Sequence, residues 1–213
     1  MKTIENTAIT KVCGVFAVRG INMRKRRFMI EMNSPVVLWI TFISLALLLF
    51  DIFMRTNMFM VLGARRTHFA DPMQYVRVFT HIFVHADLSH YVANFMMILV
   101  IGPMVEEKYG SDRLCWITII TALITGLIFV IFFPGGVLGG ASGIVFMLIL
   151  MASFTSIRQG SLPITVLLVG VLYIGNEILL GLFVSDNISR ISHIVGALCG
   201  ATFGFVYQVR KHR

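Results

Sequence analysis

The feature that most constrains this chain is a series of long apolar runs with short polar breaks between them. A helix needs about 20 apolar residues to cross a membrane, and several stretches reach or approach that length. They cover residues 36–53, 88–105, 114–133, 142–158, 162–183 and 188–209. Only 13% of the residues are charged, which is too little to cover a soluble domain of this size with polar surface. The sequence therefore predicts an all-α, polytopic membrane protein, a bundle of six transmembrane helices.

Basic residues gather at both flanks of these runs. Seven lysines and arginines precede the first run and three follow the last, in a chain with a net charge of +8. Such flanks stay on the cytoplasmic side of a membrane, so we expect both termini there and, in a bacterium, insertion into the inner membrane. The expected organisation is a basic N-terminal segment (1–34), a membrane domain (35–209) and a basic tail (210–213). The charges favour contact with the lipid bilayer over nucleic-acid binding.

A polar segment, residues 57–87, separates the first two runs. It is too long for a tight turn and too polar to span, so we expect an ordered outer loop that lies partly in the membrane interface. Its histidines His81 and His85, with His90 in the next run, invite interpretation as a metal site. No HExxH motif accompanies them, and a catalytic zinc site needs three protein ligands plus water. We therefore predict no metal and no other cofactor.

A glycine-rich loop precedes the fourth run. Gly139-Gly140-Ala141-Ser142-Gly143 follows a Pro-Gly-Gly break, and its glycines permit close backbone approach and positive φ. Ser142 is expected at a helix N-terminus, where free N–H groups and the helix dipole would stabilise an oxyanion beside the serine. One interpretation is a catalytic nucleophile, and the other is an N-cap serine in a tight loop.

A second candidate residue is His193, in the last run. Gly196, Gly200 and Gly204 follow it at four-residue intervals, and such a stripe lets another helix pack closely against the backbone. His193 lies three residues before Gly196 and therefore on the same face. We expect it to point towards the packed neighbour, and if that neighbour is the fourth span, it meets Ser142. The alternative is a buried histidine with a structural hydrogen bond.

His90 and Asn94 lie four residues apart on one face of the second run. Both side chains can donate hydrogen bonds, and an unpaired donor is unfavourable inside a membrane. They fit either an oxyanion clamp or hydrogen bonds that join the helices of the bundle. In both interpretations they face inward.

Together these motifs resemble the rhomboid family of intramembrane proteases. The matching pieces are His90-xxx-Asn94, Gly140-Ala141-Ser142-Gly143 and His193-xx-Gly196-xxx-Gly200, on the second, fourth and sixth spans. Arg77 before His81 and His85, and Glu106 with Gly110, add to the match. The resemblance runs from Gln74 to the end of the sixth span, about two-thirds of the chain. It implies a six-helix rhomboid-like bundle.

The resemblance also implies a serine endopeptidase with a Ser-His dyad. Ser142 would attack the scissile carbonyl and His193 would accept its proton. The Ser142 backbone N–H and the side chains of His90 and Asn94 would form the oxyanion hole, and the Phe146 ring would orient the imidazole. Substrates would be membrane proteins with a single transmembrane segment, cut in or near that segment.

The sequence departs from the family pattern at three positions. Tyr75-Val76-Arg77 keeps only the arginine of a Trp-Arg pair, Phe146 replaces a common tyrosine, and Ser192 stands where alanine is usual. These departures bear on rate and substrate preference more than on the catalytic atoms. Two other functions stay open: a non-catalytic rhomboid-like protein that binds membrane clients, and a small transporter lined by the histidines and Glu177.

Overall fold

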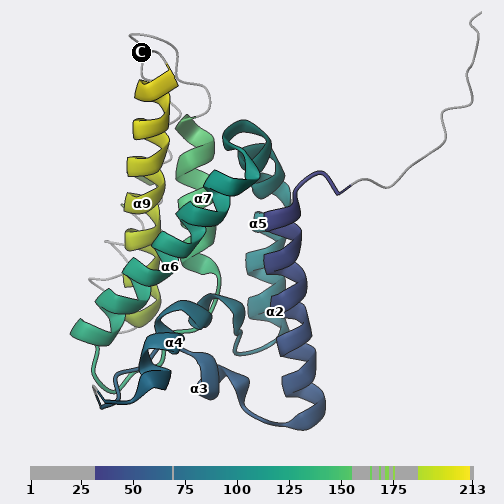
Figure 1. Cartoon of the computed structure of the whole chain (residues 1–213), viewed down its shortest axis with the longest axis vertical. Helices are drawn as coiled ribbons and strands as arrows, with labels where there is room; N and C mark the ends of the chain where they lie inside the picture. Colours follow the sequence, from purple (N-terminus) through teal and green to yellow (C-terminus); the bar gives the residue numbers. More distant parts are fainter. Residues whose placement is uncertain are drawn as a thin grey trace, which may run out of the picture. The chain divides into compact units, whose positions relative to one another are not determined.

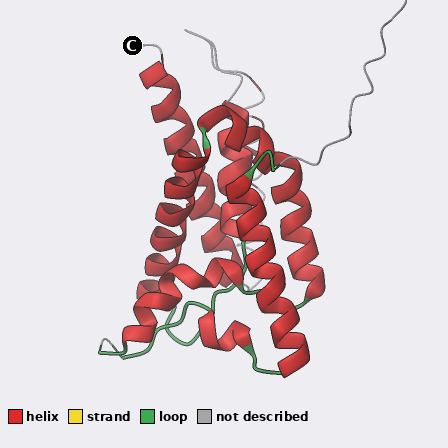
Figure 2. Ribbon diagram, turned by 45° about the vertical axis from the view of Figure 1, so that its right-hand side comes forward, coloured by secondary structure: helices red, strands yellow, loops and turns green. Residues whose placement is uncertain are grey.

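A computed structural model describes residues 32–68, 70–154 and 187–211, with five single positions between residues 164 and 175. All belong to one compact unit, Met32–Arg213. Within these ranges the secondary structure is helical, as predicted, apart from an isolated bridge between Ala64 and Leu138 (Figures 1 and 2). The elements are α2 (Pro35–Met54), α3 (Met58–Leu62), α4 (Pro72–Thr80), the 3-10 turn η2 (His81–Phe83), α5 (Leu88–Tyr109), α6 (Ser111–Phe132), α7 (Ser142–Phe154) and α9 (Asn187–Lys211).

Three of the described helices, α2, α5 and α6, are long and apolar enough to cross a membrane. They coincide with the first three predicted spans. α7 is a shorter apolar helix as far as Phe154, and α9 has 25 residues; they begin where the fourth and sixth spans were predicted. The predicted fifth span, 162–183, lies outside the described ranges except for the five single positions.

The second span extends further than the sequence indicated. It was predicted to end before Glu106, but α5 continues to Tyr109 because the Glu106 carboxylate is bound in the interior. Its two oxygens accept the backbone N–H groups of Val36 at 3.0 Å and Val37 at 3.1 Å. Glu106, only 2% exposed, thus satisfies two free donors at the N-terminus of α2 and lies at the positive end of its dipole.

The outer segment between α2 and α5 is ordered, as expected, and contains α3, α4 and η2 at one end of the bundle (Figure 1). Arg77 joins its parts, because its Nε donates to the Val61 carbonyl at 2.8 Å and its Nη1 pairs with Asp71 at 3.1 Å. The Ala64–Leu138 bridge, with two 2.8 Å hydrogen bonds, links the segment to the loop before α7. The outer segment and that loop therefore form one connected structure.

The glycine stripe of α9 packs against α7, the neighbour considered in the sequence. A methyl group at Gly196 would collide with the Gly143 carbonyl oxygen, and one at Gly200 with the Met147 carbonyl oxygen. The missing side chains therefore allow backbone-to-backbone contact between the two helices. Figure 1 shows α7 and α9 side by side along their length.

Candidate active site

The loop that leads to Ser142 is held by two histidines of the outer segment. The Gly140 N–H donates to the His81 carbonyl oxygen at 2.9 Å, and the Ala141 N–H donates to the His85 Nε2 atom at 3.3 Å. Gly140 has a φ of 125°, a conformation that a residue with a side chain rarely adopts. These contacts fix the backbone immediately before the first turn of α7.

One ring nitrogen of each of these two histidines already has a partner within the protein. His81 Nδ1 lies 3.0 Å from the Val78 carbonyl oxygen, while His85 Nε2 accepts the Ala141 N–H. Across the described ranges, no group of three or more His, Cys, Asp or Glu side chains could hold a metal ion. The two histidines of the outer segment position the loop.

His90 and Asn94 border this loop from α5. A Cβ atom on Gly140 would lie 2.7 Å from His90 Cε1 and 3.7 Å from Asn94 Nδ2, so both side chains face Gly140. The Asn94 side chain is buried, and its Nδ2 has no hydrogen-bond partner in the part of the chain that the structure describes. A buried donor without a partner costs about 1–3 kcal/mol, which makes this amide a candidate hydrogen-bond donor to a bound group.

On its other side, Ser142 borders the first turns of α9. Its Oγ lies 3.5 Å from the Oγ of Ser192, the residue before His193. One turn further along α7, the Phe146 ring stacks on the His193 ring, with centroids 4.3 Å apart and planes 8° apart. The three motifs of the sequence therefore lie close together: α5 borders the loop at Gly140, and α9 contacts α7 at Ser142 through Ser192 and at Phe146 through His193.

Two predicted supporting residues lie elsewhere. Glu106 is 16 residues after His90 on α5, about 24 Å along the helix axis, and caps α2. Arg77 joins parts of the outer segment through Val61 and Asp71. Both residues support the fold through these contacts.

The site also contains residues that the sequence interpretation did not assign. Ser192 was noted only as a departure from the family pattern, yet its hydroxyl is the one that lies next to Ser142. The rings of Tyr91 and Phe95 pack edge-on or tilted against His85, with centroids 5.6 and 5.5 Å away. Their positions in the sequence could have indicated this role. Tyr91 directly follows His90 and Phe95 directly follows Asn94, so the two rings lie on the face of α5 next to that of His90 and Asn94.

Burial keeps the two loop-holding histidines neutral. It lowers the pKa of His81 from its ordinary 6.5 to about 4, because the ring is removed from water. Burial also lowers the pKa of His85 to about 4, and the neighbouring His90 lowers it further. A neutral His85 is what the loop requires, because a protonated ring could not accept the Ala141 N–H at Nε2.

The stability of the protein is expected to fall between pH 6.5 and about pH 4. In that window the unfolded chain protonates both histidines while the folded chain does not, so lowering the pH favours unfolding. Each histidine contributes at most about 1.4 kcal/mol per pH unit to the free energy of unfolding. Denaturant unfolding in mixed micelles at pH 7.5, 6 and 5 measures the slope. His85→Gln, whose amide oxygen can still accept from the Ala141 N–H, should reduce the slope of the free energy of unfolding against pH. A slope equal to that of the wild type would contradict the neutral state of His85 in the folded protein.

Comparison with known proteins matches the same region. The Rhomboid domain family model matches residues 72–210, well over half of the chain. The chain is also 42% identical over 72 residues to proteins named Rhomboid protease GlpG from Salmonella newport, Salmonella heidelberg and Salmonella typhi. Each alignment covers 34% of this chain and 26% of the relative, so the matched part spans about a quarter of each relative's length. The chain belongs to the rhomboid family.

Proposed function

We propose that this chain is an intramembrane serine endopeptidase with Ser142 as nucleophile and His193 as general base. The observation that carries the proposal is the contact between α7 and α9. At this contact the Ser142 hydroxyl lies next to the Ser192 hydroxyl, and the His193 ring stacks on the Phe146 ring. Membership of the rhomboid family and the protease names of the matched relatives support the same activity.

In the proposed reaction, the Ser142 Oγ attacks the scissile carbonyl carbon while its proton passes to the His193 ring. The oxyanion accepts hydrogen bonds from the Ser142 N–H and from the side chains of His90 and Asn94. The proton then moves to the leaving amine. Water, deprotonated by the same ring, releases the acyl group and restores Ser142. The Nδ2 of Asn94 supports this role, since it is buried, faces the loop before Ser142 and has no acceptor among the described residues.

The Phe146 ring takes part in this proposal by orienting the base. Parallel stacking at 4.3 Å fixes the plane of the His193 ring. In a Ser-His-Asp triad a carboxylate holds the imidazole, and here the stacked ring would take over that orienting role. The base would act as one half of a dyad.

The proposed substrates are membrane proteins with a single transmembrane segment, cut in or near that segment. A helical segment must unwind before its backbone reaches a serine, and unwinding is opposed by the hydrogen bonds it would lose. Small or helix-breaking residues near the cut should therefore favour cleavage. In a bacterium the proposed location is the inner membrane, with both termini in the cytoplasm.

Labelling with a fluorophosphonate probe tests whether Ser142 is activated. We expect stoichiometric labelling of the purified wild-type protein and none of Ser142→Ala, because the probe reacts with an activated serine. Ser153→Ala is the matched control: this serine lies on the same helix and donates to the Ile149 carbonyl at 2.9 Å. Its labelling should equal that of wild type. Failure to label a folded wild-type protein would favour the non-catalytic, client-binding alternative.

A further inference from the structure

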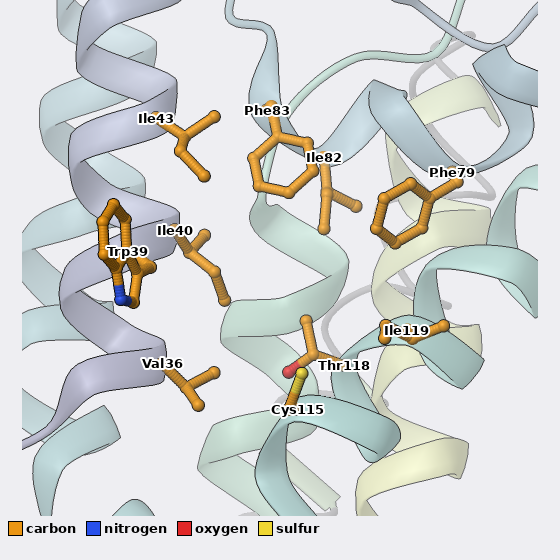
Figure 3. Close-up of a pocket in the computed structure, with 10 residues that line it drawn as sticks. All are labelled: Val36, Trp39, Ile40, Ile43, Phe79, Ile82, Phe83, Cys115, Thr118 and Ile119. Carbon is orange, nitrogen blue, oxygen red and sulfur yellow. The ribbon is translucent and has the colours of Figure 1, made fainter. Parts of the chain in front are cut away.

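The hydroxyl of Ser192 is a polar group of the candidate site to which the proposed reaction assigns no role. By contrast, the apolar pocket between α2, α6 and the outer segment adds no group to the reaction, because the 10 residues drawn in Figure 3 include none of those around Ser142. Ser192 lies on α9 directly before His193, and its Oγ is 3.5 Å from the Ser142 Oγ. Ser192 is only 3% exposed. A buried hydroxyl at this distance from the proposed nucleophile is in a position to act on it.

The packing of α9 on α7 determines where this hydroxyl lies. Ser192, Gly196 and Gly200 follow one another at four-residue intervals, so Ser192 extends the stripe of small residues that contacts α7. A Cβ atom on Gly143 would lie 3.2 Å from the Ser192 carbonyl oxygen and 3.8 Å from the Ser192 Cβ. Ser192 is therefore held against the first turn of α7, in which Ser142 is the first residue.

Packing explains a small side chain at this position but does not explain its hydroxyl. Alanine would fit the same space, form a helix more readily than serine and bring no polar atom into the interior. A hydroxyl has one donor and two acceptor positions, so Ser192 can contact Ser142 and a second group at the same time. The feature that distinguishes serine from alanine here is thus the contact that its oxygen makes with Ser142.

The proposed reaction determines the direction of a hydrogen bond between the two hydroxyls. While Ser142 gives its proton to His193, the Ser142 Oγ has no proton left for Ser192 and can only accept from it. One lone pair of the Oγ attacks the carbonyl carbon, and the other is available for the Ser192 O–H. Such a hydrogen bond stabilises negative charge on the Oγ as its proton leaves, and again when the Oγ departs from the acyl group. Ser192 keeps its own proton throughout.

We propose that Ser192 is a positioning residue of this site, whose hydroxyl donates a hydrogen bond to the Ser142 Oγ during the reaction. The role rests on the proposed function, because it requires Ser142 to be the nucleophile. The separation of 3.5 Å is longer than the usual distance of about 2.7–2.8 Å between hydroxyl oxygens. Hydrogen bonds of a site without substrate often tighten only when the substrate is bound. The same hydrogen bond would restrict rotation of the Ser142 side chain and so hold its Oγ in place.

The kinetics of fluorophosphonate labelling of Ser192→Ala test the proposal. The two measured quantities are the labelling rate constant at saturating probe and the probe concentration that gives half of that rate. We expect the rate constant to fall about 2–10-fold, the contribution of one hydrogen bond between neutral groups. The half-saturating concentration and the denaturant midpoint should stay at their wild-type values, because alanine keeps the packing against Gly143.

Two further variants separate the hydroxyl from the packing. Thr202→Ala removes another hydroxyl of α9, which donates to the Leu198 carbonyl at 2.8 Å, and should label at the wild-type rate. Ser192→Cys keeps a small side chain with only a weak donor, so its rate constant should fall as in Ser192→Ala.

Three outcomes would contradict this role, and they differ from one another. A wild-type rate constant in Ser192→Ala overturns the role of Ser192 and leaves Ser142 as the proposed nucleophile. A wild-type rate constant in Ser192→Cys, with a lowered denaturant midpoint in Ser192→Ala, assigns Ser192 to packing alone. Failure of the folded wild-type protein to label overturns the proposed function, and the role of Ser192 with it.

Discussion

Replacing Ser142 or His193 with alanine is expected to lower the rate of substrate cleavage by at least about 10⁴-fold. The first change removes the proposed nucleophile, and the second removes the group that takes its proton. Both variants should fold, because Ser142 begins α7 and the glycine contacts between α7 and α9 do not involve either side chain. Cleavage of a single-span reporter in proteoliposomes measures the rate, and unfolding in mixed micelles checks the fold.

Controls for this result come from the same chain. Ser153→Ala removes another serine hydroxyl of α7, and His68→Ala removes an exposed histidine ring of the outer segment. Both should cleave the reporter at the wild-type rate. Cleavage by Ser142→Ala above the background of an empty membrane would refute the proposed nucleophile. Loss of folding in both site variants would favour a structural role for these residues.

The Asn94→Ala variant distinguishes two possible roles of Asn94: a hydrogen-bond donor to the oxyanion, and a residue that joins two helices. Loss of one oxyanion donor lowers the rate by about 10²–10³-fold, less than loss of the nucleophile. Because the Nδ2 of Asn94 has no partner among the described residues, its removal breaks no described hydrogen bond of this donor, and stability should be largely kept. A helix-joining asparagine would behave in the opposite way, with lower stability and little direct effect on the rate per folded molecule.

The meeting of α7 and α9 could be predicted from the sequence because it depends on local patterns. Glycines at intervals of four mark a face that only another helix backbone can fill, and His193 lies on that face. Ser142 follows a glycine-rich break, which marks the start of a helix. In a membrane these signals are strong, because a polar side chain there is costly unless it is paired or faces the interior of the bundle.

The contacts that hold the loop before Ser142 and the start of α2 could not be predicted in this way because they join distant parts of the chain. His85 and Ala141 are 56 residues apart, and Glu106 and Val36 are 70 apart. Neither pair leaves a periodic pattern, and a carboxylate near a helix end looks in sequence like an ordinary surface charge. The predicted end of the second span at residue 105 was wrong for this reason, because Glu106 is buried by its contact with α2.

Glu106→Ala is expected to lower the free energy of unfolding by about 2–5 kcal/mol. The change leaves the N–H groups of Val36 and Val37 without acceptors in a buried position and removes a favourable charge from the N-terminus of α2. The free energy of unfolding of Glu106→Gln should lie between those of the wild type and Glu106→Ala, since its amide keeps one acceptor oxygen and turns a donor towards the second N–H. Denaturant titration in mixed micelles, or steric trapping in a bilayer, measures the difference.

Glu107→Ala is the matched control for this prediction, because the neighbouring glutamate is exposed and its loss should change stability by no more than about 0.5 kcal/mol. Equal destabilisation by both changes would show that charge near the end of α5 matters rather than the cap on α2.

Glu106 lies about 24 Å along α5 from His90, so the folded fraction of Glu106→Ala should cleave at close to the wild-type rate. Asn94→Ala should show the reverse, a stable protein with a low rate. Opposite effects from two residues of one helix would establish that its outer end serves the reaction while its other end holds the bundle together.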